Sequence, residues 1–475
     1  MSVRRRLILQ LLAAAALLLA PAAAAHAARN AEVSIMDDPL LLGRSQGHID
    51  NQMRIFRNLG VDRVRVSAFW NGAAPNAGSK TKPAGFDGSN PSDPRYQWSA
   101  LDRVVTSAAA HDLKVMLSIT TPAPMWATTG RRRNNLWLPS VSEFADYAGA
   151  VAQRYASSVD HYGVSNEPNQ GGWLQPQSDR TGLIAPHHYR AMVRAAYPRI
   201  KAADPSSTVL VGDLAPTGTG KRGRRKPIRP LAFLRAMACV NKHWRPTRRG
   251  RCRNFKPIPA DAIAHHPYQF FLAPNRHSRN RDDAGIGDSR RFLRALDRLV
   301  RAHRIAPSHG RRLNVFYTEF GYQTDPPDPF AGVSLGRQSR WLQQAAYIAW
   351  RTPRIRAINQ FRLTDGRIRG HGVAAFREFQ SGLLFANRRK KPAYRTFANP
   401  FFISGHRAWG QVRPGGRHAV TLQKRGLRGG RFRRVRRVRT DRRGYFSVRI
   451  GARRGQWRYV YSDGPRGHSG TIRIR

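Results

Sequence analysis

The chain alternates between short apolar, β-branched runs and longer segments whose apolar positions recur every three or four residues. The short runs are typical of buried strands, and the longer segments are typical of helices with one buried face. Eight strands are predicted, at 33–36, 61–68, 113–119, 159–165, 208–213, 262–265, 313–318 and 355–361. Seven helices are predicted between them, at 46–59, 99–111, 142–155, 187–203, 232–240, 290–303 and 338–350.

This alternation predicts a parallel sheet, because parallel neighbours need a crossover connection that a helix supplies. Eight strands separated by helices favour a closed (β/α)8 barrel, also called a TIM barrel. A doubly wound open sheet is the alternative, but no glycine-rich dinucleotide-binding motif follows the first strand. We therefore assign residues 28–400 to an α/β barrel domain.

The pattern changes after Pro400. Short alternating stretches at 419–422, 445–450, 457–461 and 471–474 are separated by glycine-rich turns, and no helical period is visible. This texture predicts a small antiparallel β-sandwich, an all-β module at 405–475. The module is strongly basic, since residues 431–443 contain eight arginines and one acid, Asp441.

The first residues have the pattern of an export signal. Three arginines at 4–6 precede an apolar run at 7–25, and Ala25-His26-Ala27 fits a cleavage site. We therefore predict a signal peptide at 1–27 and a secreted or extracellular protein, with an uncleaved membrane anchor as the alternative. Export permits disulfides, so Cys239 and Cys252 are predicted to pair, unless they are two unrelated thiols.

Composition narrows the class of protein further. With 475 residues, of which 41% are hydrophobic, the chain can bury a sizeable core. Its 83 Lys and Arg against 28 Asp and Glu give a formal charge of +55. Two cysteines exclude a disulfide-dense scaffold and any four-thiolate metal site. A single long apolar run, at the N-terminus, excludes a polytopic membrane protein.

Two glutamates follow strands that lie half a barrel apart. The strand at 159–165 leads into Asn166-Glu167-Pro168, and the strand at 313–318 leads into Glu319. In a barrel of this kind the active site lies at the carboxyl ends of the strands, so the two side chains are expected to face each other. Cleavage of a glycosidic bond needs such a pair, one carboxyl to protonate the leaving oxygen and one to attack or stabilise the anomeric carbon. The alternative is two surface acids at loop starts.

These residues resemble the clan A retaining glycoside hydrolases, near families 5 and 39. The similarity extends over about residues 31–400. It includes Arg65 on the second strand and the aromatic segment Tyr96-Gln97-Trp98 before the second helix. Two turns also match, Pro124-Met125-Trp126 after the third strand and His266-Pro267-Tyr268 after the sixth strand. The segment 383–394 resembles the segment that closes the barrel in these families.

The resemblance implies a role for each of these polar side chains. Glu167 would be the general acid/base and Glu319 the nucleophile of a retaining enzyme that acts on a β-linked oligo- or polysaccharide without a cofactor. Arg65 would keep Glu319 ionised, whereas Glu167, without such a partner, would hold its proton. Asn166 would bind the sugar 2-hydroxyl. Tyr268 would steady Glu319, and His266 would line the same subsite; Asp213 is expected to be structural.

One departure concerns the aromatic platform for the sugar. Many members of these families end the eighth strand with a tryptophan, whereas this chain has Gln360-Phe361. Either of these two residues takes that place, or Trp70 or Trp126 stacks on the sugar. Trp173 is a further candidate, because an aromatic residue just past a barrel strand favours a sugar platform over a core position.

The positive charge suggests partners. Arg131–Arg133 and the segment 221–229 follow strands three and five, so a basic rim is expected to attract an acidic polysaccharide, and the basic module an anionic cell envelope. Nucleic acid is not expected, because no recognition motif accompanies the charge. No metal site is predicted. The rival interpretation is a non-catalytic polysaccharide-binding protein on a degenerate barrel.

Overall fold

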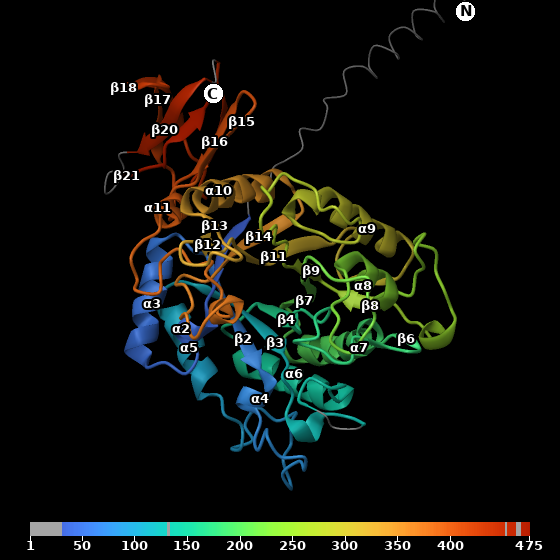
Figure 1. Ribbon diagram of the computed structural model, residues 1–475. Helices are drawn as coiled ribbons and strands as arrows, with labels where there is room; N and C mark the ends of the chain where they lie inside the picture. The colour runs from blue at the N-terminus through green and yellow to red at the C-terminus, as the bar shows by residue number, and fades with distance from the viewer. Residues whose placement is uncertain (1–30, 131–133, 452–453, 462–466) are drawn as a thin grey trace, which may run out of the picture.

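The computed structural model describes residues 31–130, 134–451, 454–461 and 467–475. It contains a closed barrel of parallel strands followed by further β-sheets (Figure 1). The predicted signal peptide at 1–27 and the basic segment Arg131–Arg133 lie outside the described residues. In the part of the chain that is described, no helix is both long and apolar enough to cross a membrane.

The barrel strands lie side by side in the order in which they occur along the chain, and the last one returns to the first. They are β1 Glu32–Met36, β2 Arg63–Phe69, β3 Lys114–Thr120, β4 His161–Val164, β7 Thr208–Leu214, β9 Ala262–His265, β11 Asn314–Phe320 and β14 Ile355–Phe361. All neighbouring pairs are parallel, and β1 closes the barrel by pairing with β14, with Val33 opposite Ile358. The predicted (β/α)8 barrel is confirmed, and the open sheet is excluded.

Helices connect successive barrel strands. They are α3 Gln46–Asn58, α5 Ser99–Ala110, α6 Val141–Tyr155, α7 Ala185–Ala203, α8 Pro230–Met237, α9 Ser289–Arg301 and α10 Leu335–Arg351, with α11 Pro392–Ala398 after the last strand. Short elements lie in the connections: α2 Asp38–Leu41, α4 Trp70–Ala73, and the strand pairs β5 Ser178–Asp179 with β6 Gly182–Leu183, β8 Ile258–Ala260 with β10 Ile305–Pro307, and β12 Thr324–Asp325 with β13 Val333–Ser334.

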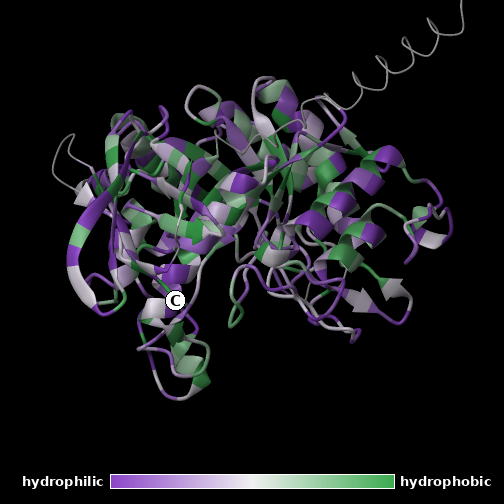
Figure 2. Cartoon of the chain, turned by 90° about the horizontal axis from the view of Figure 1, so that it is seen from above, coloured by the Kyte–Doolittle hydropathy of each residue, from purple (hydrophilic) through white to green (hydrophobic). Residues whose placement is uncertain are grey.

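The outer helices show how an arginine-rich chain builds a core. On α9 the buried residues Phe292, Leu296 and Leu299 share one face, while Arg290, Arg294 and Arg298 lie four residues apart on the exposed face. Figure 2 shows the same alternation of hydrophobic and hydrophilic residues along the helices around the barrel. The charge is therefore carried by solvated faces and leaves the packed interior apolar.

The C-terminal module consists of two antiparallel sheets, which confirms the predicted β-structure. One sheet contains β15 Phe401–Ser404, β16 Arg407–Gln411 and β19 Tyr445–Arg449; the other contains β18 Gly429–Arg439, β17 Ala419–Gly426, β20 Gly455–Tyr461, β21 Gly467–His468 and β22 Ile472–Ile474. Its core includes Phe401, Leu422 and Trp457. Strand β15 precedes residue 405, the predicted start of the module, and pairs with β16.

The module packs on the outer face of α10 (Figure 1). Trp409 lies 5.7 Å from Tyr347 and 5.8 Å from Trp350 between ring centroids, and Tyr445 lies 6.3 Å from Trp350. In addition, Gln343 of α10 accepts a hydrogen bond of 2.9 Å from the backbone of Phe401. This helix is therefore covered on both sides, by the barrel and by the module.

A second contact joins the module to the beginning of the barrel. Arg443 donates a 2.6 Å hydrogen bond to Asp62, and the hydroxyl of Tyr445 lies 3.3 Å from the carbonyl oxygen of Ala31. Gly60 allows the close approach, because a Cβ atom there would lie 2.4 Å from the Cβ of Arg413. The C-terminal module thus packs against the residues next to the first two barrel strands.

Candidate active site

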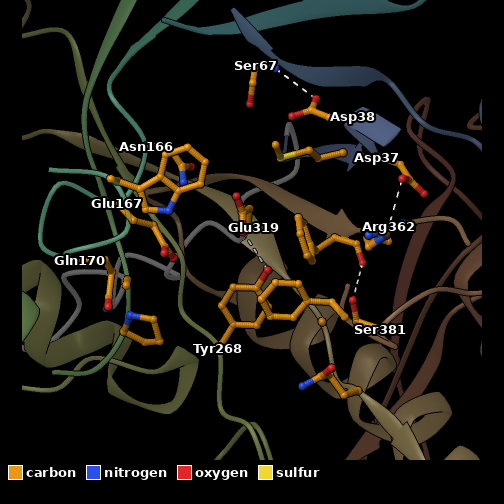
Figure 3. Close-up of a pocket in the computed structure, with 18 of the residues that line it drawn as sticks. Asp37, Asp38, Ser67, Asn166, Glu167, Gln170, Tyr268, Glu319, Arg362 and Ser381 are labelled. Carbon is orange, nitrogen blue, oxygen red and sulfur yellow. Dashed lines mark hydrogen bonds and ion pairs between the residues drawn. The ribbon is translucent and has the colours of Figure 1, made fainter. Parts of the chain in front are cut away.

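Glu167 and Glu319 meet at the mouth of the barrel, as the geometry of the fold requires. Strand β4 ends at Val164, and the chain turns through Ser165 and Glu167, which have φ angles of 68° and 37°. Glu319 lies at the end of β11. Both line one cavity of about 680 Å³ (Figure 3). A carboxylate oxygen of each lies within 4.8 Å of one of the other.

Glu319 is held at both of its oxygens. The Nη1 of Arg65 donates a 2.6 Å hydrogen bond to Oε1, and the hydroxyl of Tyr268 donates a 2.9 Å hydrogen bond to Oε2. Arg65 is fully buried inside the barrel. Burial opposes its charge, but Asp213 and Glu319 outweigh this and raise the pKa of Arg65, so its positive charge is permanent.

Arg65 also organises the side chains around Glu319. It donates hydrogen bonds to Asn166 Oδ1 at 2.7 Å and to Asp213 Oδ2 at 3.2 Å. Burial alone would raise the pKa of Asp213, but Arg65 and His266 lower it well below its usual range. Gly163 leaves room for this layer, since a Cβ there would lie 3.2 Å from Asp213 Oδ2. Asp213 therefore balances charge beneath the cavity, consistent with its expected structural role.

Glu167 has a cationic partner, contrary to the sequence-based expectation. The Nδ1 of His266 lies 2.9 Å from its Oε1 and 3.6 Å from Glu319 Oε2. Burial opposes protonation of His266, but Glu319, Asp213 and Glu167 together raise its pKa to about 9. The pKa of Glu167 itself is raised, because burial outweighs the opposing effect of His266. The expectation of a protonated Glu167 thus has a different physical basis, desolvation rather than isolation.

The predicted aromatic platforms divide into two groups. Trp70 is buried and stacks on Tyr147 at 5.8 Å, and Trp126 packs edge-on against Trp70 and donates its indole N–H to the backbone of Pro75. Neither is among the residues that line the cavity, which corrects their assignment as sugar-stacking residues. Trp173 and Phe361 do line it.

Phe361, and not Gln360, takes the aromatic position at the end of the eighth barrel strand. The side chain of Gln360 is buried and donates to the carbonyl of Ser381 at 2.9 Å. Phe361 lines the cavity and packs edge-on against Tyr268, with ring centroids 6.2 Å apart. The sequence left open which of these two residues takes that position, and the opposite directions of their side chains decide for Phe361.

Several lining residues were missed by the sequence analysis. Asp37 and Asp38 follow β1 directly, so the rule applied to β4 and β11 would have found them; Asp38 accepts a 3.2 Å hydrogen bond from the backbone of Ser67 (Figure 3). Burial raises the pKa of Asp37 to about 6, against the opposing effect of Arg362 at 3.6 Å. Phe270 and Phe379 come from loops, where no periodic pattern points to them.

Within the described residues, two groups of side chains are close enough to share a metal ion. One contains Glu167, His266 and Glu319, and the other contains His187, Cys239 and Cys252. Cys239 and Cys252 form a disulfide, which confirms the predicted pairing and leaves no thiolate. A His266 with a pKa of about 9 carries a proton where a ligand needs a lone pair. Both groups therefore fit structural or acid–base roles better than metal binding.

Two carboxylates that face each other at the mouth of a parallel barrel are the arrangement that glycosidases use to cleave a glycosidic bond. The sequence matches the family described as cellulase, glycosyl hydrolase family 5, over residues 29–346, so the chain belongs to this family. No curated protein matches the chain at a significant level.

Solved structures with similar folds include members of two glycoside hydrolase families. A family 39 glycoside hydrolase from the gut symbiont Bacteroides cellulosilyticus WH2 aligns with a TM-score of 0.53 and 13% identity, covering 90% of this chain and 80% of that one. The GH39 enzyme from Xanthomonas axonopodis pv. citri aligns with a TM-score of 0.50 and 15% identity over 94% of both chains. A GH5_18 structure from Streptomyces cattleya in complex with GlcNAc aligns with a TM-score of 0.50 and 18% identity over 78% and 79%. These similarities concern the fold alone.

Proposed function

We propose that this glycosidase hydrolyses a β-linked glycoside with retention of configuration, with Glu319 as nucleophile and Glu167 as general acid/base. The observation that supports retention is the spacing of the two carboxylates, whose oxygens approach within 4.8 Å. Retaining enzymes place their carboxyl groups about 5–5.5 Å apart, whereas inverting enzymes need about 6.5–9.5 Å to fit a water molecule.

In the first step Glu319 attacks the anomeric carbon while Glu167 donates its proton to the leaving oxygen. The raised pKa of Glu167 favours the acid form that this step consumes. Arg65 and Tyr268 bind Glu319 from behind and orient the attacking oxygen. Because Arg65 binds the Oδ1 of Asn166, the NH2 group of this amide is what can donate to a sugar hydroxyl.

In the second step Glu167, now ionised, takes a proton from water as the water attacks the glycosyl–Glu319 ester. The bond between the sugar and Glu319 breaks, Glu319 leaves as a carboxylate, and Glu167 regains its proton. His266 favours the ionised form of Glu167 at this stage, since its Nδ1 lies 2.9 Å from Oε1. His266 thus assists Glu167 as a base in the second step, while burial assists Glu167 as an acid in the first step.

The test uses a panel of 4-nitrophenyl β-glycosides with wild type, Glu167→Ala and Glu319→Gln. Each variant should lose several orders of magnitude in kcat. Azide should rescue Glu167→Ala on these activated substrates and give a β-glycosyl azide. The matched control is Glu143→Gln, which changes an acid on α6 that pairs with Lys82 and should leave activity unchanged.

Retention itself is read from the anomer that forms first, by nuclear magnetic resonance. A β-product supports the double displacement, and an α-product contradicts it. Equal, measurable turnover by wild type and both cavity variants would show that the catalytic residues are misassigned, whereas no turnover by wild type would favour the rival function of a polysaccharide-binding protein.

The charge distribution refines the predicted acidic substrate. Among the described residues that line the cavity, four acids, Asp37, Asp38, Glu167 and Glu319, face one arginine, Arg362. Glu167 holds its proton in the proposed first step, so the like charge that a uronate at the cleavage point would meet is mainly that of the proposed nucleophile Glu319, and we propose a neutral sugar there.

The basic residues of the 221–229 loop lie elsewhere. Arg222 and Arg224 line a separate groove, together with Arg180, His187 and Arg251. An acidic part of a polysaccharide would bind in this groove, with a rate advantage that added salt removes. This rate advantage is measured by comparing initial rates on neutral and uronate-bearing polymers at low and at high salt. Secretion and association of the module with an anionic envelope stay predictions.

A further inference from the structure

Exposed apolar side chains are concentrated on loops that follow neighbouring barrel strands, at the end of the barrel where the cavity opens. Seven large apolar residues that are 42–68% exposed lie on the loops after β9, β11 and β14, three neighbouring strands of the barrel. We call them the apolar rim: Phe270, Phe271, Leu272, Phe330, Ile368, Val373 and Phe379. Among the described residues, the only other large apolar side chain this exposed is Val435, on β18 of the C-terminal module.

The rim is continuous with the catalytic residues. Phe270 and Phe379 line the cavity itself. Tyr268, which binds Glu319, stacks on Phe270 at 6.1 Å, and Phe361 contacts Tyr268 at 6.2 Å and Phe379 at 5.4 Å between ring centroids. An unbroken path of aromatic contacts therefore runs from the nucleophile to the protein surface.

The two rim residues inside the cavity have an unusual backbone. Phe270 and Phe379 have φ angles of 52° and 35°, in the left-handed region that bulky residues rarely adopt. Glu167 and Asp213, at the centre of the site, share this conformation. Such strain persists where the surrounding structure imposes it, and it concentrates at ligand-binding positions. The exposure of these two rings is thus built into the loops.

The composition of the rim indicates what it contacts. Leu272, Ile368 and Val373 have no ring face on which a sugar could stack, and none of the seven side chains can hydrogen-bond a hydroxyl group. Exposed apolar patches of this kind mark binding sites for apolar ligands. The rim therefore suits a hydrocarbon chain better than the next sugar unit of a polysaccharide.

We propose that the apolar rim binds the aglycone of the substrate, and that this aglycone is an alkyl chain, as in a glycolipid. The sugar then occupies the polar end of the cavity between Glu167 and Glu319, and the chain leaves the cavity over Phe270 and Phe379. Cleavage of such a glycoside rests on the hydrolytic function proposed above, whereas binding of the chain does not.

Binding is measured first, in the Glu319→Gln background, where turnover is blocked. Methyl, butyl and octyl β-glucosides, β-xylosides and β-mannosides are titrated by calorimetry below their micelle-forming concentrations. Since each buried methylene adds affinity, Kd should fall at least about tenfold from the butyl to the octyl glycoside of the preferred sugar.

Two rim variants locate the effect. Phe270→Ser/Phe379→Ser should remove most of the ratio between the Kd values of the butyl and octyl glycosides, whatever its effect on the Kd of the methyl glycoside. Phe271→Ser/Leu272→Ser/Val373→Ser changes only exposed side chains that do not line the cavity, so it serves as a second test if the first variant folds poorly. It should reduce the gain in affinity from the butyl to the octyl glycoside severalfold. Val435→Ser is the matched control and should keep the full gain.

Three results overturn the proposal. They are a Kd independent of chain length for all three sugars, an equal gain in wild-type rim and rim variants, and tighter rim-dependent binding of cellotetraose than of octyl glucoside. Capture by phosphatidylcholine vesicles through the rim, without any gain for octyl glucoside, would instead make the rim a membrane surface and also overturn the proposal. If octyl glycosides bind as expected but wild type hydrolyses no glycoside, the hydrolytic function fails and the aglycone site stands.

Discussion

Tyr268 links three parts of the molecule through a single side chain. Its hydroxyl binds Glu319, and its ring contacts Phe270 and Phe361. A hydrogen bond to a charged group contributes about 1.5–3 kcal/mol. Tyr268→Phe keeps the ring and removes only this bond, so kcat/KM for an aryl glycoside should fall about 10- to 100-fold. Unchanged activity at an unchanged melting temperature would show that Glu319 needs no hydroxyl donor.

His266 makes the stability of the fold depend on pH. Its pKa is about 9 in the folded protein and about 6.5 in an unfolded chain. The folded state therefore binds the proton more tightly, and the resulting stabilisation is complete below pH 6.5 and lost as pH rises through 9. The free energy of unfolding, measured in urea, should fall across this window. His266→Gln should lack this slope, and an identical slope in both proteins would exclude His266 as its source.

The same variant has a second readout in catalysis. Protonated His266 opposes the effect of burial on Glu167, so its removal should raise the pKa of Glu167 further. The alkaline limb of kcat/KM reports loss of the acid's proton and should move to higher pH in His266→Gln. A purely structural role for His266 would lower activity without moving this limb.

At the scale of elements, β2 explains one error of the sequence-based assignment. Side chains alternate along a strand, so Arg65, Ser67 and Phe69 share the face that points into the barrel. Trp70 follows Phe69 and points the other way, toward Tyr147. The positions of Glu167 and Glu319 at the mouth were predictable because they depend on strand ends alone, whereas the position of Trp70 depended on side-chain parity that one more count would have given.

Two further elements show the limits of sequence patterns. Strand β18 was not predicted, because arginines occupy both of its faces. Among the described residues it lies at the edge of a sheet and pairs with β17 alone. Charge is tolerated at such an edge, where it discourages pairing with other chains.

Helix α8 was predicted to reach residue 240 but ends at Met237, since Cys239 has a φ of 52°. Residues in loops, such as Phe379, follow no hydrophobic periodicity, so their place in the cavity could be found only from the structure.

The disulfide stabilises the connection after α8. Cys239 and Cys252 close a loop with a sequence separation of 13, and Arg190 of α7 binds the backbone of Met237 and Arg251 at its two ends. Loops of this length give about 3 kcal/mol when cross-linked. Cys239→Ser/Cys252→Ser should lose about that much in urea unfolding. No described residue between the two cysteines lines the cavity, so aryl glycosidase activity should be retained.

A reductant supplies the control for this prediction. It should destabilise wild type to the level of the double variant and leave the variant itself unchanged. Equal stability of oxidised and reduced wild type would contradict a stabilising role.

At the scale of the whole molecule, the barrel and the module pack against each other. Trp409 is fully buried against Tyr347 and Trp350 of α10. Replacing a buried tryptophan with alanine costs about 3–5 kcal/mol, so Trp409→Ala should lower the melting temperature of the entire protein. Val435→Ala, on the exposed edge strand, should stay within about 0.5 kcal/mol. Two separate thermal transitions with an unchanged barrel transition would show that the parts unfold independently.

Contacts between the two ends of the chain have a consequence for biosynthesis. Arg443 reaches Asp62 across 381 positions, Tyr445 reaches Ala31 across 414, and β14 pairs with β1. A ribosome therefore makes β2 early, which pairs with one edge of β1, but the partner of the other edge, β14, is not complete until residue 361. Until β14 has been made, that edge of β1 stays open, so we expect nascent chains that stop before residue 355 to aggregate unless chaperones protect them.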